Sequence, residues 1–191
     1  MKVYLYLNPE GFSNCYLVVN EQTNEAIIID PGIVPEDLIT KIEASNISLK
    51  AVLITHNHSS HVNGLKTLRN IYDFVTYAAD WEIAQNESTI LTCDGKLRIA
   101  GLLIHYTSLP GHTTDSIIFK IENMLFTGDV LCAGTIGSTN SSYSKFILKS
   151  NIENKIYSQQ DAMVLMPGHG PPSTIAAVRE FNIDFKPEDD N

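Results

Sequence analysis

The sequence predicts an α/β fold in a single domain. Short apolar runs alternate with segments in which apolar residues recur at helical spacing, the pattern of strands and helices layered together. The chain has 191 residues, of which 43% are hydrophobic and 18% charged, so it can bury a substantial core. No linker or composition shift interrupts it. We therefore expect one domain over residues 1–185 and an acidic, disordered tail over 186–191.

The expected elements follow from apolar runs between turn residues and from apolar residues spaced i, i+4. Three strands come first, at Val3–Leu7, Cys15–Val19 and Ala26–Ile29. A helix after Pro35 places Leu38 and Ile42 on one face. The later expected strands are Ala51–Ile54, Val75–Ala78, Leu97–Ile99, Leu102–Tyr106, Ser116–Ile121, Met124–Phe126 and, as the last one, Ala162–Met166. The later expected helices are 62–71, Trp81–Ala84, Ser144–Tyr157 and Ser173–Glu180.

Charge and cysteine content exclude several classes of protein. Thirteen Lys and Arg against 22 Asp and Glu give a net charge of −9, which disfavours a nucleic-acid partner. No apolar stretch approaches membrane-spanning length, and the first apolar run ends at Asn8, too early for a secretory signal. The 3 cysteines form no C-x-x-C pair, which favours a reducing compartment. A cytoplasmic protein without a membrane partner is expected.

Histidines mark a candidate site. Of 6 histidines, only His105 lies inside an expected strand, where a structural role is the simpler interpretation. The others fall in loops that follow expected strands: His56, His58, His61, His112 and His169. Loops at strand ends can aim side chains at a common point, and a metal needs imidazoles that converge from several directions.

Asp129 belongs with these histidines. It follows the expected strand Met124–Phe126, and Gly128 before it lets the backbone turn sharply. A carboxylate can bridge two divalent ions, and imidazole with carboxylate suits zinc, iron or manganese better than magnesium or calcium. The sequence therefore predicts a metal site.

Five motifs occur in a fixed order along the chain. They are I-I-D-P-G at Ile28–Gly32, T-H-N-H-S-S-H at Thr55–His61, P-G-H-T at Pro110–Thr113, F-T-G-D at Phe126–Asp129 and P-G-H-G at Pro167–Gly170. Together they resemble the metallo-β-lactamase superfamily, and the stretch 126–137 resembles its small glyoxalase II-type hydrolases. The resemblance implies a four-layer αβ/βα sandwich with a metal site at one edge, between the two sheets.

The resemblance also implies a role for each matching residue. Asp30 matches an early aspartate that supports the site without binding metal, although a turn-capping role explains it equally well. The first metal would be held by His56, His58 and His112, the second by His61 and His169, and Asp129 would bridge the two.

Two positions depart from the family pattern. Ser60 stands where the family has an aspartate that ligates the second metal and orients the attacking water, so Asp129 and Ser60 occupy the catalytic positions. A neutral hydroxyl is a poor substitute, and we expect the second site to be weak or empty at modest metal concentration. Asp115 is the nearest spare carboxylate, with turn capping as its expected role. Ser138 replaces a common arginine, so glutathione recognition does not carry over.

The implied function is hydrolysis of a small acyl thioester or ester by a metal-activated hydroxide, with one or two zinc ions, or iron or manganese, as cofactor. The expected oligomeric state is a monomer or a homodimer. Two alternatives stay open. One is a mononuclear iron persulfide dioxygenase that uses His56 or His58 with His112 and Asp129, and the other is a non-catalytic metal-binding protein whose site has decayed at Ser60. A nuclease is disfavoured by the charge of −9, and a true β-lactamase by Asp129, where many lactamases have cysteine.

Overall fold

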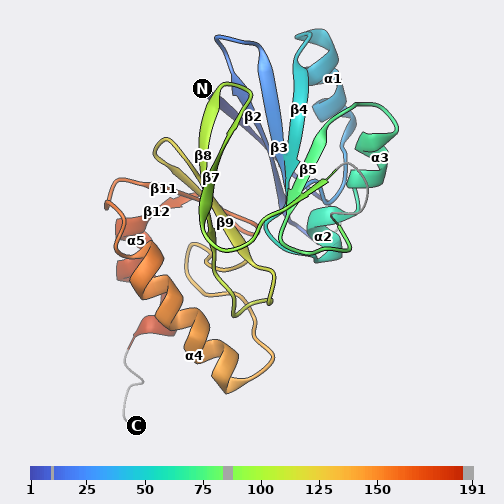
Figure 1. The fold of residues 1–191 in the computed structure, drawn as a ribbon. Helices are drawn as coiled ribbons and strands as arrows, with labels where there is room; N and C mark the ends of the chain where they lie inside the picture. The colour runs from blue at the N-terminus through green and yellow to red at the C-terminus, as the bar shows by residue number, and fades with distance from the viewer. Residues whose placement is uncertain (10, 84–87, 187–191) are drawn as a thin grey trace.

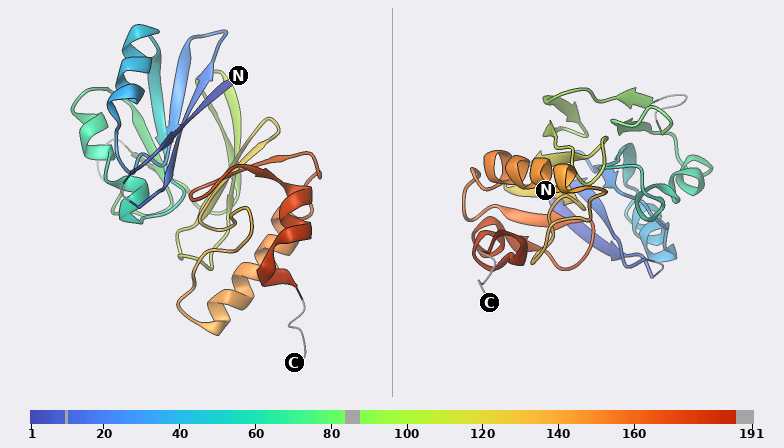
Figure 2. Two further views of the ribbon diagram at one scale, coloured as in Figure 1. Left: turned by 180° about the vertical axis from the view of Figure 1, so that it is seen from behind. Right: turned by 90° about the horizontal axis from the view of Figure 1, so that it is seen from below.

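The computed structural model describes residues 1–9, 11–83 and 88–186. Two six-stranded sheets face each other and helices cover both outer faces, which confirms the predicted four-layer sandwich (Figures 1 and 2). The first sheet has the order β1 (Lys2–Leu7), β2 (Asn14–Asn20), β3 (Glu25–Ile29), β4 (Ser48–Leu53), β5 (Val75–Ala78), β6 (Ser88–Ile90). The second has the order β12 (Ser173–Thr174), β11 (Val164–Pro167), β10 (Met124–Gly128), β9 (Ile117–Ile121), β8 (Leu102–Ser108), β7 (Gly95–Ile99).

The helices divide between the two outer faces. The first sheet is covered by α1 (Glu36–Ala44), α2 (Ser59–Val62) and α3 (Leu65–Arg69). The second is covered by α4 (Ser142–Asn151), a π-helical turn η1 (Ile152–Ile156) and α5 (Ile175–Phe181), followed by a 3₁₀ turn η2 (Ile183–Phe185). Among the described residues, no helix is both long and apolar enough to cross a membrane.

Alternation along the strands accounts for the layers. In β2, Tyr16 and Val18 pack between the sheets, whereas Cys15 and Leu17 pack against the helices on the outer side. Both faces of this strand are buried, because successive side chains point to opposite faces and each face meets another layer. A third apolar cluster lies under α4, where Leu148 packs with the strands β9 to β11. The core is therefore three apolar layers between four structural ones.

Several elements differ from the prediction. Of the helix expected over 62–71, only 65–69 form a helix of their own (α3), and Val62 is the last residue of α2. The break lies at Gly64, which packs against Pro31: its amide donates to the Pro31 carbonyl (2.7 Å), and a Cβ there would lie 2.4 Å from that oxygen. The expected helix Trp81–Ala84 is wrong over 81–83, which form a turn, and Ala84 lies outside the described residues. The short strands β6 and β12 were not predicted. The tail beyond 186 also lies outside the described residues, so its boundary stays a prediction.

The two sheets are joined at one edge. The Ile117 amide donates to the Thr55 carbonyl (2.8 Å), and the Asn14 amide donates to the Gly168 carbonyl (2.7 Å). The buried Tyr16 hydroxyl donates to the Pro167 carbonyl (2.6 Å). These contacts hold the end of β4 against the start of β9 and β2 against the end of β11, and the candidate site lies there.

Candidate metal centre

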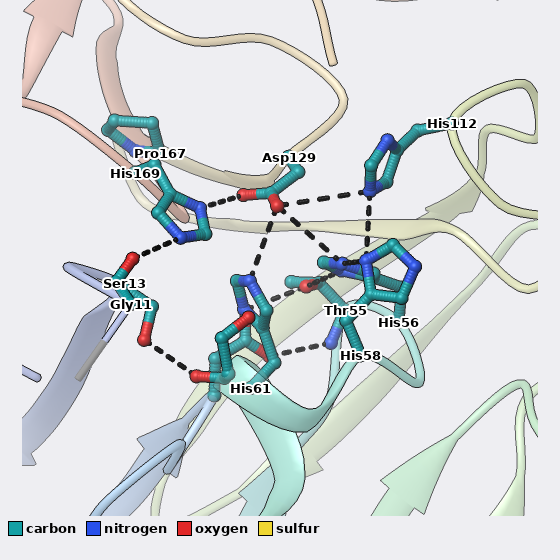
Figure 3. A network of polar contacts seen from close by, with 12 residues as sticks. Gly11, Ser13, Thr55, His56, His58, His61, His112, Asp129, Pro167 and His169 are labelled. Carbon is teal, nitrogen blue, oxygen red and sulfur yellow. Dashed lines mark hydrogen bonds and ion pairs between the residues drawn. The ribbon is translucent and has the colours of Figure 1, made fainter. Parts of the chain in front are cut away.

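The structure brings the six predicted ligands together at this edge (Figure 3). His56 and His58 follow β4, His61 lies in the short helix α2, and His112 lies between β8 and β9. Asp129 follows β10 and His169 follows β11. Within each of two groups, all candidate ligand atoms lie within 4.8 Å of one another: His56, His58, His112 and Asp129 in the first, and His61, Asp129 and His169 in the second. Asp129 is therefore shared between them.

The first group has the spacing of a tetrahedral ligand set. His58 Nδ1 lies 2.9 Å from His56 Nε2 and 3.2 Å from His112 Nε2. Asp129 Oδ2 lies 3.8 Å from each of the same two Nε2 atoms. Ligand atoms about 2.05 Å from a tetrahedral zinc ion lie about 3.3 Å apart, close to these distances. His58 is exposed, so the group is open to solvent on one side.

Outer hydrogen bonds set the tautomers of two of these histidines. The Thr55 hydroxyl donates to Asp30 Oδ2 (2.7 Å), so at 3.0 Å it accepts from Nδ1 of His56. His112 Nδ1 donates to the Ser138 carbonyl (2.7 Å). In both rings the proton is on Nδ1, which leaves the Nε2 lone pair facing the centre of the group. Burial, with further help from neighbouring imidazoles, lowers the pKa of His56 to about 2, so this ring is neutral and able to bind metal.

The second group contains a buried atom without a hydrogen bond. His61 Nδ1 contacts Asp30 Oδ2 at 3.0 Å, and its Nε2 faces Asp129 Oδ2 at 3.4 Å without hydrogen-bond geometry. Burial alone would lower the pKa of His61, but the two carboxylates outweigh it and raise the pKa to about 10. A proton or a metal ion must therefore lie between this ring and Asp129, and metal binding would displace the proton.

Asp129 carries the negative charge that both groups share. Its Oδ1 lies 2.7 Å from His169 Nδ1, and the other nitrogen of that ring donates to the Gly11 carbonyl at 3.0 Å. Burial alone would raise the pKa of Asp129, but its contacts with His169 and His61 hold it well below its usual range. Converging imidazole lone pairs around one ionised carboxylate fit a divalent cation.

Asp30 organises the centre from behind. This buried carboxylate accepts from the Thr55 amide (2.8 Å) and the Thr55 hydroxyl (2.7 Å) and contacts His61 Nδ1 (3.0 Å). It thus orients His61 directly and His56 through Thr55. Its backbone has a φ of 53°, in the left-handed region where Asp and Asn are the side chains best accommodated after glycine. Of the two interpretations of Asp30 from the sequence, these contacts favour support of the site.

Asp30→Asn is expected to weaken metal affinity by roughly 10- to 100-fold, the usual effect of losing a hydrogen-bond partner behind a ligand. The asparagine oxygen can still accept from the Thr55 amide, but its NH₂ cannot accept from the Thr55 hydroxyl and His61. Competition with a chelating dye measures the affinity. Asp37→Asn, an exposed change on α1, is the control, and equal affinities in the two variants would contradict this role of Asp30.

Two glycines allow the backbone to pack directly against the ligands. A Cβ at Gly137 would lie 2.0 Å from the Asp129 carbonyl oxygen and 2.8 Å from His112 Nδ1. A Cβ at Gly168 would lie 2.4 Å from Asp129 Oδ1 and 2.6 Å from His61 Cε1. Side chains at these positions would displace the ligands, which explains Gly137 and the first glycine of the P-G-H-G motif.

Asp115 belongs to neither group of candidate ligands among the described residues. The Ser60 carbonyl accepts from the Ser13 hydroxyl (2.6 Å), which fixes the backbone beside His61. Asp115 accepts from the Asn57 amide (2.8 Å), the kind of loop-capping contact expected of it. His105 lies in β8, away from both groups.

Sequence reasoning missed the acceptors behind the ligands. Thr55 transmits the effect of Asp30 to His56, and its place directly before the H-x-H pair was the only available signal. The carbonyl groups of Gly11 and Ser138 orient His169 and His112. Main-chain acceptors have no sequence signature, since every residue has a carbonyl.

Comparisons with protein families, sequences and solved structures all point to the same superfamily. Residues 8–82 match a model described as "Metallo-beta-lactamase superfamily". The hydroxyacylglutathione hydrolase GloC of Haemophilus influenzae is 33% identical, over 88% of this chain and 91% of that protein. The crystal structure of the BLEG-1 B3 metallo-β-lactamase is 26% identical with a TM-score of 0.86, covering 97% of this chain and 100% of the other. ETHE1 from Myxococcus xanthus shares the fold at 24% identity and a TM-score of 0.84, over 96% and 84% of the two chains.

A four-layer α/β fold with histidines and an aspartate clustered where its two sheets meet is the architecture of a metallo-hydrolase superfamily. This chain belongs to the metallo-β-lactamase superfamily, and its relatives include a glyoxalase II enzyme. The resemblance found in the sequence motifs is thereby confirmed. Superfamily and cluster together indicate a metal cofactor.

Proposed function

We propose that this protein hydrolyses a small, uncharged acyl thioester or ester at the metal centre in which the two groups of ligands share Asp129. The observation that carries the proposal is the position of Asp129, whose carboxylate belongs to both groups of ligands, together with a cavity that has His112 of the first group in its wall. The name of the Haemophilus influenzae relative, a hydroxyacylglutathione hydrolase, supports a thioester as the bond cleaved.

Zinc is the proposed metal, because three imidazole nitrogens and one carboxylate oxygen at near-tetrahedral spacing suit it best. His56, His58, His112 and Asp129 would hold the principal ion, while His61 and His169 would hold a second, weaker one with Asp129. A divalent ion held by these residues would lower the pKa of a water molecule and polarise the substrate carbonyl.

A cavity of about 320 Å³ beside His112 is the proposed substrate site. Its lining includes Thr113 and Thr114 from the β8–β9 turn and Tyr143 and Ile147 from α4. Among the residues that the structure describes, no lysine, arginine or carboxylate lines this cavity. Lys145 of α4 is not in the lining and pairs with Asp184 at 3.2 Å.

This lining bears on the substrate. Hydroxyl groups and apolar side chains suit an uncharged acyl group, while a glutathione moiety brings carboxylates that would find no cation in the cavity. His112 lies in the wall, so an acyl carbonyl bound here is placed beside the first group of ligands. The cavity therefore supports a neutral thioester over a glutathione thioester.

The test is a comparison of two thioesters on zinc-loaded protein, with metal content measured on the same sample. We expect kcat/KM for a neutral N-acetylcysteamine thioester to exceed that for S-lactoylglutathione by roughly tenfold or more, since burying unpaired carboxylates is costly. Iron as the native metal with no cleavage of either thioester would overturn the proposal.

A matched pair of aromatic residues tests the cavity itself. Tyr143→Ala removes part of the lining and is expected to raise KM by roughly tenfold. Phe146→Ala changes another exposed aromatic residue, three positions further along α4, that does not line the cavity, so the KM of this variant should stay unchanged. The same KM in both variants would place the substrate elsewhere.

A further inference from the structure

A row of basic side chains crosses the outer face of the second sheet, away from the metal centre. Lys96 on β7 pairs with His105 on β8, and His105 pairs with Lys120 on β9. Arg98, two residues beyond Lys96, lies on the same face. Directly opposed strand residues lie about 5 Å apart, so the row brings several nitrogen donors into one short stretch of surface.

This row begins where the helices stop covering the sheet. On the same outer face, Ile118 of β9 and Leu125 of β10 are buried under the helical layer. Lys96, Arg98 and His105 are exposed instead. The open part of the face is hollowed by two cavities, of about 400 Å³ and 200 Å³, and both are lined by His105 and Lys120.

The positive charges of the row lack matching carboxylates. Lys120 Nζ donates to the neutral Gln159 Oε1 (2.9 Å). Within the described residues, no carboxylate oxygen lies within 4.0 Å of the charged groups of Lys96, Arg98 or Lys120. One acidic side chain, Glu122, lines the larger cavity, and Lys155 beside the smaller one is 3.7 Å from Asp94. The chain as a whole has a net charge of −9, but here cations are in excess, and a bound anion would offset the repulsion between them.

We propose that the Lys96–His105–Lys120 row, with Arg98, is a second ligand site that binds a small phosphate-bearing anion. Arg98 offers the planar fork that matches phosphate oxygens, and Lys120 stands between the two cavities. The exposed Leu103, on the same face of β8 as His105, adds an apolar side chain to the lining of the larger cavity, which suits an organic body beside the anionic group. Cavities of this size take a small molecule, and a charge of −9 repels a polyanionic macromolecule.

The experiment is a titration of ¹⁵N-labelled, metal-loaded protein with inorganic pyrophosphate at constant ionic strength, with metal content checked afterwards. We expect saturable amide shifts at residues 96–98, 103–105 and 119–121. In the double variant Lys96→Gln/Arg98→Gln, on an exposed edge strand, the half-saturating concentration should rise roughly tenfold or more. Lys120→Gln should raise it as well.

The charge-matched control is the double variant Lys2→Gln/Lys66→Gln, two exposed lysines on β1 and α3, which should titrate like the unmodified protein. Equal weakening in both double variants would show a general charge effect and overturn the site. Shifts confined to the metal centre, or no saturation, would overturn it too. Tighter binding of citrate or of an acidic peptide than of pyrophosphate would contradict the phosphate class of the ligand.

Discussion

Asp129→Asn is expected to remove metal from the protein and to lower kcat/KM for the thioester by about a thousandfold or more, the scale of losing a central charge-stabilising group. Asp129 is the one residue that belongs to both groups of candidate ligands. The amide has nearly the same size but no charge, so the converging imidazoles lose the carboxylate that offsets a cation. Elemental analysis and the thioester assay on one sample measure both effects.

The control for this variant is Asp161→Asn. Asp161 is an exposed carboxylate paired with Arg179 at 2.8 Å, outside both groups of ligands. The Asp161→Asn substitution removes one negative charge, as Asp129→Asn does, and should leave metal content and turnover unchanged. A fully metal-loaded, active Asp129→Asn protein would contradict the proposed centre.

Ser60→Asp is expected to strengthen the second metal site by roughly tenfold or more, because it adds both a ligand oxygen and a negative charge. The second group offers ligands only from His61, Asp129 and His169 among the described residues. The unmodified protein should therefore hold about one zinc per chain at micromolar free metal, and the variant should approach two. Calorimetric titration with zinc measures the number of ions and their affinities.

Ser59→Asp is the matched control, since it places the same charge one residue earlier, on an exposed side chain. It should leave the second site weak. Two tightly held ions in the unmodified protein would show that Ser60 does not limit that site. If Ser60→Asp instead turned an inert protein into an active hydrolase, the unmodified chain would be a non-catalytic metal-binding protein.

The layers of the fold could be predicted from the sequence because each layer depends on a local pattern of apolar residues. The alternation in β2 sends Tyr16 to one core and Leu17 to the other, and such buried strands are visible as apolar runs. By contrast, β6 and β12 are short strands held by pairing with β5 and β11, a tertiary effect. The break at Gly64 likewise arises from contact with Pro31, which is distant in sequence.

The same distinction holds for the candidate site. The ligands could be identified from the sequence, because few residue types bind such metals and these ones follow predicted strands. Their orientation depends on Asp30, on Thr55 and on main-chain carbonyl groups such as that of Ser138. Those contacts connect residues 25 or 26 positions apart, and only the folded backbone brings them together.

The division of ligands between the two halves of the chain links metal to the folded state. The half that contains the first sheet supplies His56, His58 and His61, and the half that contains the second supplies His112, Asp129 and His169. An unfolded chain does not bring these ligands together, so metal that binds them stabilises the folded state and the contact between the two sheets. At a free concentration one thousand times the dissociation constant, an ion that binds only the native state adds about 4 kcal/mol to the free energy of unfolding. The supply of metal thus governs the persistence of the folded chain as well as its chemistry.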